Sequence, residues 1–288
     1  MPGFFGFFDY TKPGKGIEKD DPEKHPFFLF FELLWRKLGR LILLNVIFFI
    51  ILIPIVTAVY VQIYGDAFEA QLQQDSNASL LPIFLYEVWI SLPAVAQYIL
   101  LGVSAVLYGP ASCATAYMLR NFTQQRHAWN SDFWDKLKEN FKQGLALGLL
   151  DILLFGLFAF NLSITAGLGG GLMTVARVVS MALMFIYLMM RNYTYLMAVT
   201  FELRLSQLLK NAWIFAVMGL WRNILTLVIN GGLILLTVAI HPIAELLVMP
   251  LILFSLTGFV SVFMCFPVLK KHMLDKQAQP QAADPSEA

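Results

Sequence analysis

The sequence contains few charged residues, and this excludes an ordinary soluble domain. Asp, Glu, Lys and Arg make up only 14% of its 288 residues, whereas globular domains contain about a quarter. Hydrophobic residues reach 58%, and the mean hydropathy is +0.68. Apolar stretches such as Leu41–Val61 and Leu145–Phe160 approach the roughly 20 residues that cross a hydrocarbon core. The composition therefore predicts an integral membrane protein.

Cysteine is also scarce, and the N-terminus lacks a leader pattern. Cys113 and Cys265 each lie inside an apolar run, so no disulfide framework is indicated and both are predicted to be buried apolar side chains. The first residues do not form a basic segment followed by an apolar core and a small-residue cleavage site, so we expect no cleaved signal peptide. A net charge of +1 gives no global field to attract nucleic acid.

Residues that could form a catalytic or metal site are scattered along the chain. The four histidines fall in termini and loops without metal-ligand spacing: His25, His127, His241 and His272. No HExxH, GxSxG or paired-carboxylate motif stands out. The glycine-rich segment 12–17 has no Ser or Thr after its lysine, so it is not a phosphate-binding loop. We predict a non-catalytic protein with no catalytic residues, no metal and no cofactor.

Six apolar segments are long enough to be transmembrane helices, so the predicted fold class is an all-α, polytopic membrane bundle with additional interfacial amphipathic helices. The predicted spans are 41–63, 92–119, 144–164, 172–200, 220–240 and 243–269. Pro26 can begin the first helix, and Pro54 is expected to kink it. Within the acidic region 64–91, the first half can extend that helix and 80–90 can form a short interfacial piece. Together these segments make up a membrane domain that covers residues 26–269. A cytoplasmic arm, 1–25, precedes this domain, and a disordered cytoplasmic tail, 270–288, follows it.

Two segments between spans have the pattern of amphipathic helices. Ser131–Lys142, with Ser131 as the expected N-cap, carries apolar residues on one face and charges on the other. A second such helix covers 205–213, with apolar residues at helical spacing. The apolar positions are Phe133, Trp134, Leu137 and Phe141 in the first helix and Leu205, Leu208, Leu209 and Trp213 in the second. These faces can dock a partner protein or lie on the lipid surface, and both interpretations remain open.

The positive charges indicate an orientation. Of the 20 Lys and Arg residues, 19 fall in segments that would share one side of the membrane, and Arg177 alone lies near the other side. Because cytoplasmic loops carry the excess of Lys and Arg, this distribution places both termini in the cytoplasm.

A few polar residues lie inside the predicted spans, where a charge is unfavourable unless it is paired or hydrated. Asp151 and Arg191 lie at comparable depths in antiparallel spans and are predicted to pair, either as a salt bridge that fixes helix packing or in a ligand or coupling role. Near the outer side, Arg177 can pair with Glu245 or attract an anionic group, or it can instead pack or extend toward water. Asn45, Asn161 and Asn230 are candidates for hydrogen bonds between helices.

Five blocks of the sequence resemble the YesL-like membrane family of unknown function, which is found largely in Gram-positive bacteria. The blocks are Trp35–Asn45, Ile53–Thr57, Gly109–Phe122, Ser131–Gln143 and Phe266–His272. The resemblance implies a multi-pass protein of the bacterial cytoplasmic membrane that assists carbohydrate uptake, with ABC-type sugar transporter subunits as partners alongside the lipid bilayer. It implies no catalytic residues.

The leading prediction is thus a non-catalytic accessory to carbohydrate uptake or transport, and two alternatives remain. A stand-alone small-solute transporter is favoured by the recurring order of span, amphipathic helix and span, and by the helix breaks at Pro54 and Gly109-Pro110. A signalling or assembly scaffold would use the acidic region 64–91 as its sensor.

Overall fold

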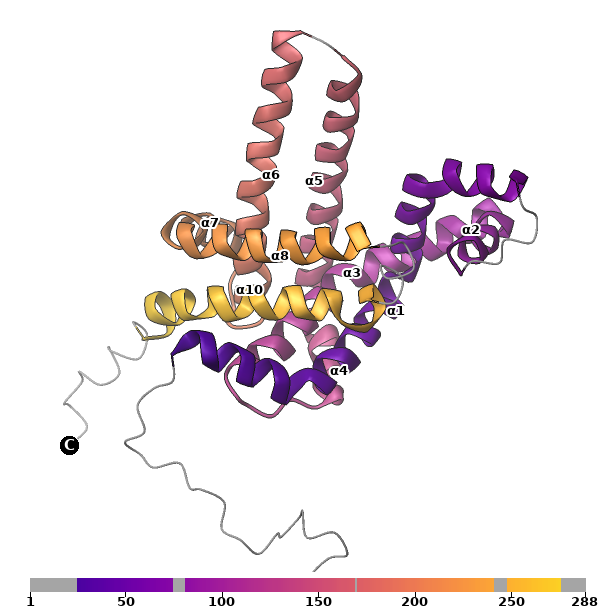
Figure 1. The fold of residues 1–288 in the computed structure, drawn as a ribbon. Helices are drawn as coiled ribbons and strands as arrows, with labels where there is room; N and C mark the ends of the chain where they lie inside the picture. Colours follow the sequence, from indigo (N-terminus) through magenta and orange to yellow (C-terminus); the bar gives the residue numbers. More distant parts are fainter. Residues whose placement is uncertain (1–24, 75–80, 169, 241–247, 276–288) are drawn as a thin grey trace, which may run out of the picture. The chain divides into compact units, whose positions relative to one another are not determined.

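A computed structural model describes residues 25–74, 81–168, 170–240 and 248–275, and the regular structure in these ranges is helical (Figure 1). The helices are α1 (Pro26–Gln74), α2 (Leu81–Ser91), α3 (Ala94–Thr123), α4 (Asn130–Glu139), α5 (Phe141–Gly167), α6 (Gly171–Ala198), α7 (Leu205–Met218), α8 (Leu220–Ile240) and α10 (Phe254–Leu269). Short π-helical turns, Met249–Leu253 and Lys270–Leu274, flank α10.

Six helical segments in these ranges are long and apolar enough to cross a membrane, and they confirm the predicted fold class. They are Pro26–Ala67, Ala94–Thr123, Phe141–Gly167, Gly171–Ala198, Leu220–Thr237 and Met249–Leu274. The chain divides into two compact units, Met1–Arg36 and Lys37–Ala288, and the boundary falls within α1. All the tertiary contacts discussed below lie within the second unit.

The region between the first two spans contains two helical pieces, as the sequence indicated. α1 continues to Gln74, and α2 covers Leu81–Ser91. The Tyr86 hydroxyl donates a hydrogen bond of 2.8 Å to the Glu69 carboxylate, and this bond raises the pKa of the Tyr86 phenol. The predicted N-cap at Ser131 is wrong: α4 begins at Asn130, and the Asp132 carboxylate accepts the Trp129 N–H at 2.9 Å. Of the predicted arm 1–25, residues 1–24 lie outside the described residues, as do residues 276–288 of the predicted disordered tail, whose start forms the π-helical turn Lys270–Leu274.

The α3 and α5 helices cross at a point where both present glycine. A Cβ atom built on Gly109 would lie 1.9 Å from the Gly144 carbonyl oxygen, and one on Gly148 would lie 2.7 Å from the Gly109 Cα. Gly144 and Gly148 are four residues apart and therefore lie on one face of α5. This small-xxx-small pattern lets the two backbones approach to a distance that no larger residue permits.

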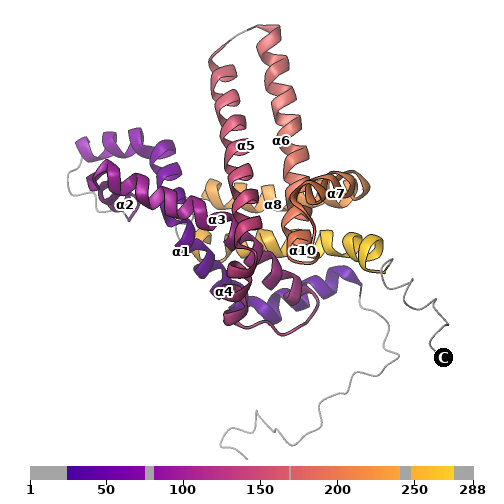
Figure 2. The same cartoon turned by 180° about the vertical axis from the view of Figure 1, so that it is seen from behind.

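The α5 and α6 helices lie side by side in both views (Figures 1 and 2). Their outer halves are joined by polar contacts: Ser180 donates a 2.8 Å hydrogen bond to the Asn161 side chain, and the Arg177 guanidinium donates to the Thr165 carbonyl. Exposed apolar side chains cover the outside of this helix pair, among them Leu153, Leu157, Phe160, Leu172, Val175 and Val179. A surface of this kind is suited to contact with lipid tails.

The start of the last span is held by the side chain of Asn45. Its amide nitrogen donates to the carbonyls of Met249 and Pro250, at 2.8 and 2.6 Å, and its oxygen accepts the Ser255 N–H at 2.8 Å. A π-helical turn and a proline both disturb the regular backbone ladder of a helix. Asn45 is fully buried in α1, and its side chain satisfies backbone groups at the start of the last span.

Replacement of Asn45 by alanine is therefore expected to be strongly destabilising. Three hydrogen bonds to buried backbone groups are lost, and we expect the free energy of unfolding to fall by about 2–3 kcal/mol. Asn211→Ala, at a half-buried position on α7, is the control and should cost less than 1 kcal/mol. Denaturation in mild detergent measures both. Equal stability of the two variants would show that Asn45 does not support the last span.

Candidate functional site

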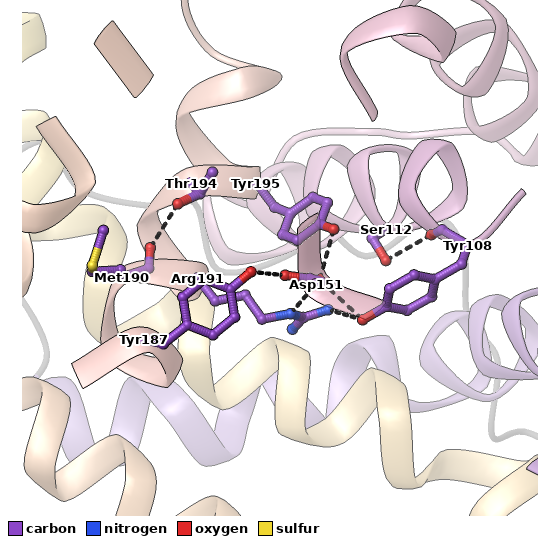
Figure 3. A network of polar contacts seen from close by, with 8 residues as sticks. All are labelled: Tyr108, Ser112, Asp151, Tyr187, Met190, Arg191, Thr194 and Tyr195. Carbon is purple, nitrogen blue, oxygen red and sulfur yellow. Dashed lines mark hydrogen bonds and ion pairs between the residues drawn. The ribbon is translucent and has the colours of Figure 1, made fainter. Parts of the chain in front are cut away.

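A polar cluster lies among α3, α5 and α6 and is centred on Asp151 (Figure 3). One carboxylate oxygen accepts hydrogen bonds from Tyr108 at 3.1 Å, from the Arg191 Nε at 2.8 Å and from Tyr195 at 2.8 Å. The other oxygen accepts from Tyr187. Four side chains from two neighbouring helices thus donate to a single carboxylate on α5.

Arg191 forms the opposite side of this cluster. Besides its ion pair with Asp151, its Nη2 donates a 2.7 Å hydrogen bond to the Tyr108 hydroxyl. Its guanidinium lies 4.9 Å from the centre of the Tyr195 ring and 5.9 Å from that of Tyr108. The Asp151 side chain is only 3% exposed and that of Arg191 27%. The aromatic rings shield the charges and the tyrosine hydroxyls donate hydrogen bonds to the carboxylate, which lowers the cost of placing an ion pair within a span.

Local sequence spacing explains how the cluster assembles. Tyr187, Arg191 and Tyr195 follow one another at intervals of four residues, so α6 presents them on one face. Asp151 lies less than one turn after Gly148, and Tyr108 directly precedes Gly109. The close glycine crossing of α3 and α5 therefore brings the Tyr108 hydroxyl within reach of the Asp151 carboxylate.

The cluster joins side chains of α3, α5 and α6, so it can fix the packing of these three helices or serve the ligand or coupling role that the sequence also allows. An ionised carboxylate only accepts hydrogen bonds, and the Asp151 oxygens already receive four of them. Three of the four donors bind Oδ2 and only Tyr187 binds Oδ1, so most of the acceptor capacity of Asp151 is used within the protein. Among the described residues, moreover, no group of three or more His, Cys, Asp or Glu is arranged to hold a metal ion.

The structure brings Asp151 and Arg191 together. Of the second predicted pair, it describes Arg177 only. Glu245 falls outside the described residues. Arg177 points its Nη2 at the Thr165 carbonyl of the neighbouring helix. Of the three intramembrane asparagines, Asn45 and Asn161 make the contacts described above, and Asn230 donates to Ser261 at 2.9 Å and to the Thr257 carbonyl at 3.2 Å.

The predicted docking faces divide into buried and exposed residues. Phe133, Leu137 and Leu208 are buried within the protein, so their predicted role in docking a partner or lipid needs correction: these side chains pack internally because α4 and α7 lie against the spans. Phe141 and Leu209 are half-buried. The residues of the predicted set that remain on the surface are Trp134 at 47%, Leu205 at 37% and Trp213 at 49% exposure.

The tyrosines of the cluster were missed by the sequence analysis. Tyrosine near the end of a span is ordinarily interpreted as an interfacial anchor. The signal that could have identified them is the interval of four residues from Tyr187 through Arg191 to Tyr195, since two phenols flank an intramembrane cation on one helix face. No comparable spacing marks Tyr108, which reaches the cluster from another helix.

The fold and the cluster define a multi-pass helical membrane protein whose spans enclose a buried ion pair. Within it, residues 41–162 match the family model described as "Protein of unknown function, DUF624". This segment contains the glycine crossing and Asp151 and ends before α6, which supplies Arg191. No curated protein and no solved structure matches the chain.

Proposed function

We propose that this protein is a non-catalytic accessory to a membrane transport system, with carbohydrate uptake as the transport it assists. The carbohydrate assignment rests on the YesL-like sequence blocks. The segregation of 19 of 20 Lys and Arg residues supports a cytoplasmic location for both termini. On this proposal the protein resides in a bacterial cytoplasmic membrane and binds subunits of an ABC-type sugar transporter.

The observation that supports the proposal is that the polar groups of the Asp151 cluster are directed mainly at one another. A stand-alone transporter needs polar groups that face a cavity within the membrane, whereas the donors of this cluster point at Asp151. A groove of about 460 Å³ between α6 and α8 is lined by apolar residues and glycine, including Phe185, Met189, Leu227 and Gly231. Such a lining offers no hydrogen bonds to a sugar.

Partner binding is assigned to the exposed residues of α4 and α7. Trp134 is flanked by the charged residues Asp135 and Lys136, and Trp213 projects from α7 with about half of its surface exposed. Tryptophan is enriched among the residues that dominate binding energy at protein interfaces. Both helices lie in segments that belong to the cation-rich side of the protein.

Affinity purification of the tagged protein tests this function. The protein is co-expressed with its chromosomal neighbours and purified in mild detergent. The co-eluting chains are then identified by mass spectrometry. We expect stoichiometric recovery of permease or ATPase subunits. Trp134→Ala combined with Trp213→Ala should reduce that recovery about tenfold or more, while Leu172→Ala, at the lipid-facing end of α6, should leave it unchanged. Recovery of the protein alone would contradict a stable accessory role.

A further inference from the structure

A second polar site lies between α1, the end of α3 and the start of α4, away from the Asp151 cluster. It is a cleft of about 220 Å³ lined by Arg40, Leu43, Phe122, Ala128, Trp129 and Asn130. The lining combines a guanidinium, an indole, a side-chain amide and three apolar side chains, and it includes no carboxylate. This composition suits an anion that is attached to an apolar group.

The Arg40 guanidinium is held in place by one hydrogen bond and has further N–H donors. The Arg40 Nη1 donates a 3.3 Å hydrogen bond to the Ala128 carbonyl, which fixes the guanidinium at the loop before α4. A guanidinium carries five N–H donors in a planar fork, so this one bond leaves donors that can bind two oxygens of a phosphate. Lys37 adds positive charge nearby, with its ammonium 5.9 Å from the centre of the Phe122 ring.

The start of α4 contributes to the same electrostatic field. The helix begins at Asn130, which itself lines the cleft, and a helix N-terminus carries a partial positive charge. The nearest carboxylate on this helix, Asp132, accepts the Trp129 N–H at 2.9 Å and so is engaged with the backbone. The Asp132 carboxylate offsets the partial charge of this helix end, so the positive charge at the cleft comes chiefly from the Arg40 guanidinium, with the Lys37 ammonium near Phe122.

The apolar side of the cleft indicates that this anion belongs to a lipid. Arg40 directly precedes the apolar stretch that starts at Leu41, so the cleft lies where headgroups meet acyl chains. Leu43 is 42% exposed and Trp129 67%, and indole rings favour this depth of a bilayer. Basic pockets between transmembrane helices on the cytoplasmic side are a known setting for anionic lipid headgroups.

We infer that the cleft binds the phosphate of an anionic phospholipid. The Arg40 guanidinium holds the phosphate, Asn130 and the Trp129 indole contact the polar part of the lipid, and Leu43 contacts the beginning of an acyl chain. This site is independent of the accessory function proposed above, because a protein that binds no transporter subunit can still retain the lipid.

Native mass spectrometry of the purified full-length protein with phosphatidylglycerol or phosphatidylcholine tests the assignment. We expect phosphatidylglycerol to be retained preferentially. Arg40→Gln should reduce that retention about fivefold, the effect of one cation near a charged headgroup, and Arg40→Lys should keep part of it. The control Arg204→Gln removes an exposed cation at the start of α7 and should have no effect. Equal retention of both lipids by the wild type would overturn the assignment, even if Arg40→Gln did not fold.

A competition experiment separates a lipid from a soluble phosphate. Glycerol 3-phosphate and inorganic phosphate carry the same anionic group without an acyl chain, so millimolar concentrations should displace little phosphatidylglycerol. Trp129→Ala should weaken lipid retention and leave any binding of inorganic phosphate unchanged. Full displacement of the lipid by glycerol 3-phosphate would show that the cleft takes a soluble phosphate, and the lipid assignment would fail.

Discussion

Gly148→Ala is expected to lower the free energy of unfolding by about 1–3 kcal/mol, the usual cost of overpacking a tight contact, and Gly148→Leu is expected to abolish the folded protein. The new Cβ would lie 2.7 Å from both the Cα and the nitrogen of Gly109. These are backbone atoms, so no side chain can rotate away and α3 and α5 must separate. Because Tyr108 and Asp151 flank the crossing, separation also weakens their hydrogen bond.

Gly156 provides a matched control on the same helix. A Cβ at this position meets nothing within 4 Å, and alanine has a higher helix propensity than glycine by about 1 kcal/mol. Gly156→Ala should therefore be neutral or slightly stabilising. Thermal unfolding in detergent, followed by the loss of monodisperse protein in chromatography, compares the variants. If Gly148→Ala were as stable as Gly156→Ala, the close crossing would not exist.

Asp151→Leu and Arg191→Leu are each expected to destabilise the protein by about 3–5 kcal/mol, since each leaves an unpaired charge or unpaired donors within a span. The double variant should lose less free energy of unfolding than the two single variants lose in total. Replacement of a complete ion pair by apolar residues removes the desolvation penalty together with the attraction. Two-state unfolding in detergent then gives a coupling energy of about 1–3 kcal/mol, the range for residues in one network.

Charge reversal at these two positions is a poor test of the pair. An arginine at position 151 could not accept the hydrogen bonds of Tyr108, Tyr187 and Tyr195, so the reversed pair is expected to remain unstable. Tyr195→Phe removes a hydrogen bond to a charged carboxylate and should cost about 1.5–3 kcal/mol. Exposed Asp135→Ala on α4 is the control and should have little effect. Strictly additive losses for the two leucine variants would show that Asp151 and Arg191 do not act as a pair.

Much of the architecture could be predicted because the bilayer constrains the sequence directly. A span must be apolar and long enough to cross, so α8 begins at Leu220 and ends at Ile240, the residues predicted for the fifth span. Asp151 and Arg191 were candidates for the same reason, because a charge in an apolar segment is conspicuous. Prediction was weaker for α4 and α7: helical spacing identified their apolar residues, but spacing alone does not distinguish a face that packs on the protein from one that faces lipid.

The sequence by itself determined the helical class, the six apolar spans and the segregation of positive charge, because hydropathy and charge act residue by residue along the chain. The tertiary structure decided which residues of different helices are in contact. Only the approach of α3 to α5 at Gly109 and Gly148 recruits Tyr108 to the Asp151 carboxylate, and only the fold places Asn45 against the backbone of the last span. These contacts join residues between 43 and about 200 positions apart, and their geometry depends on how helices cross rather than on any local pattern.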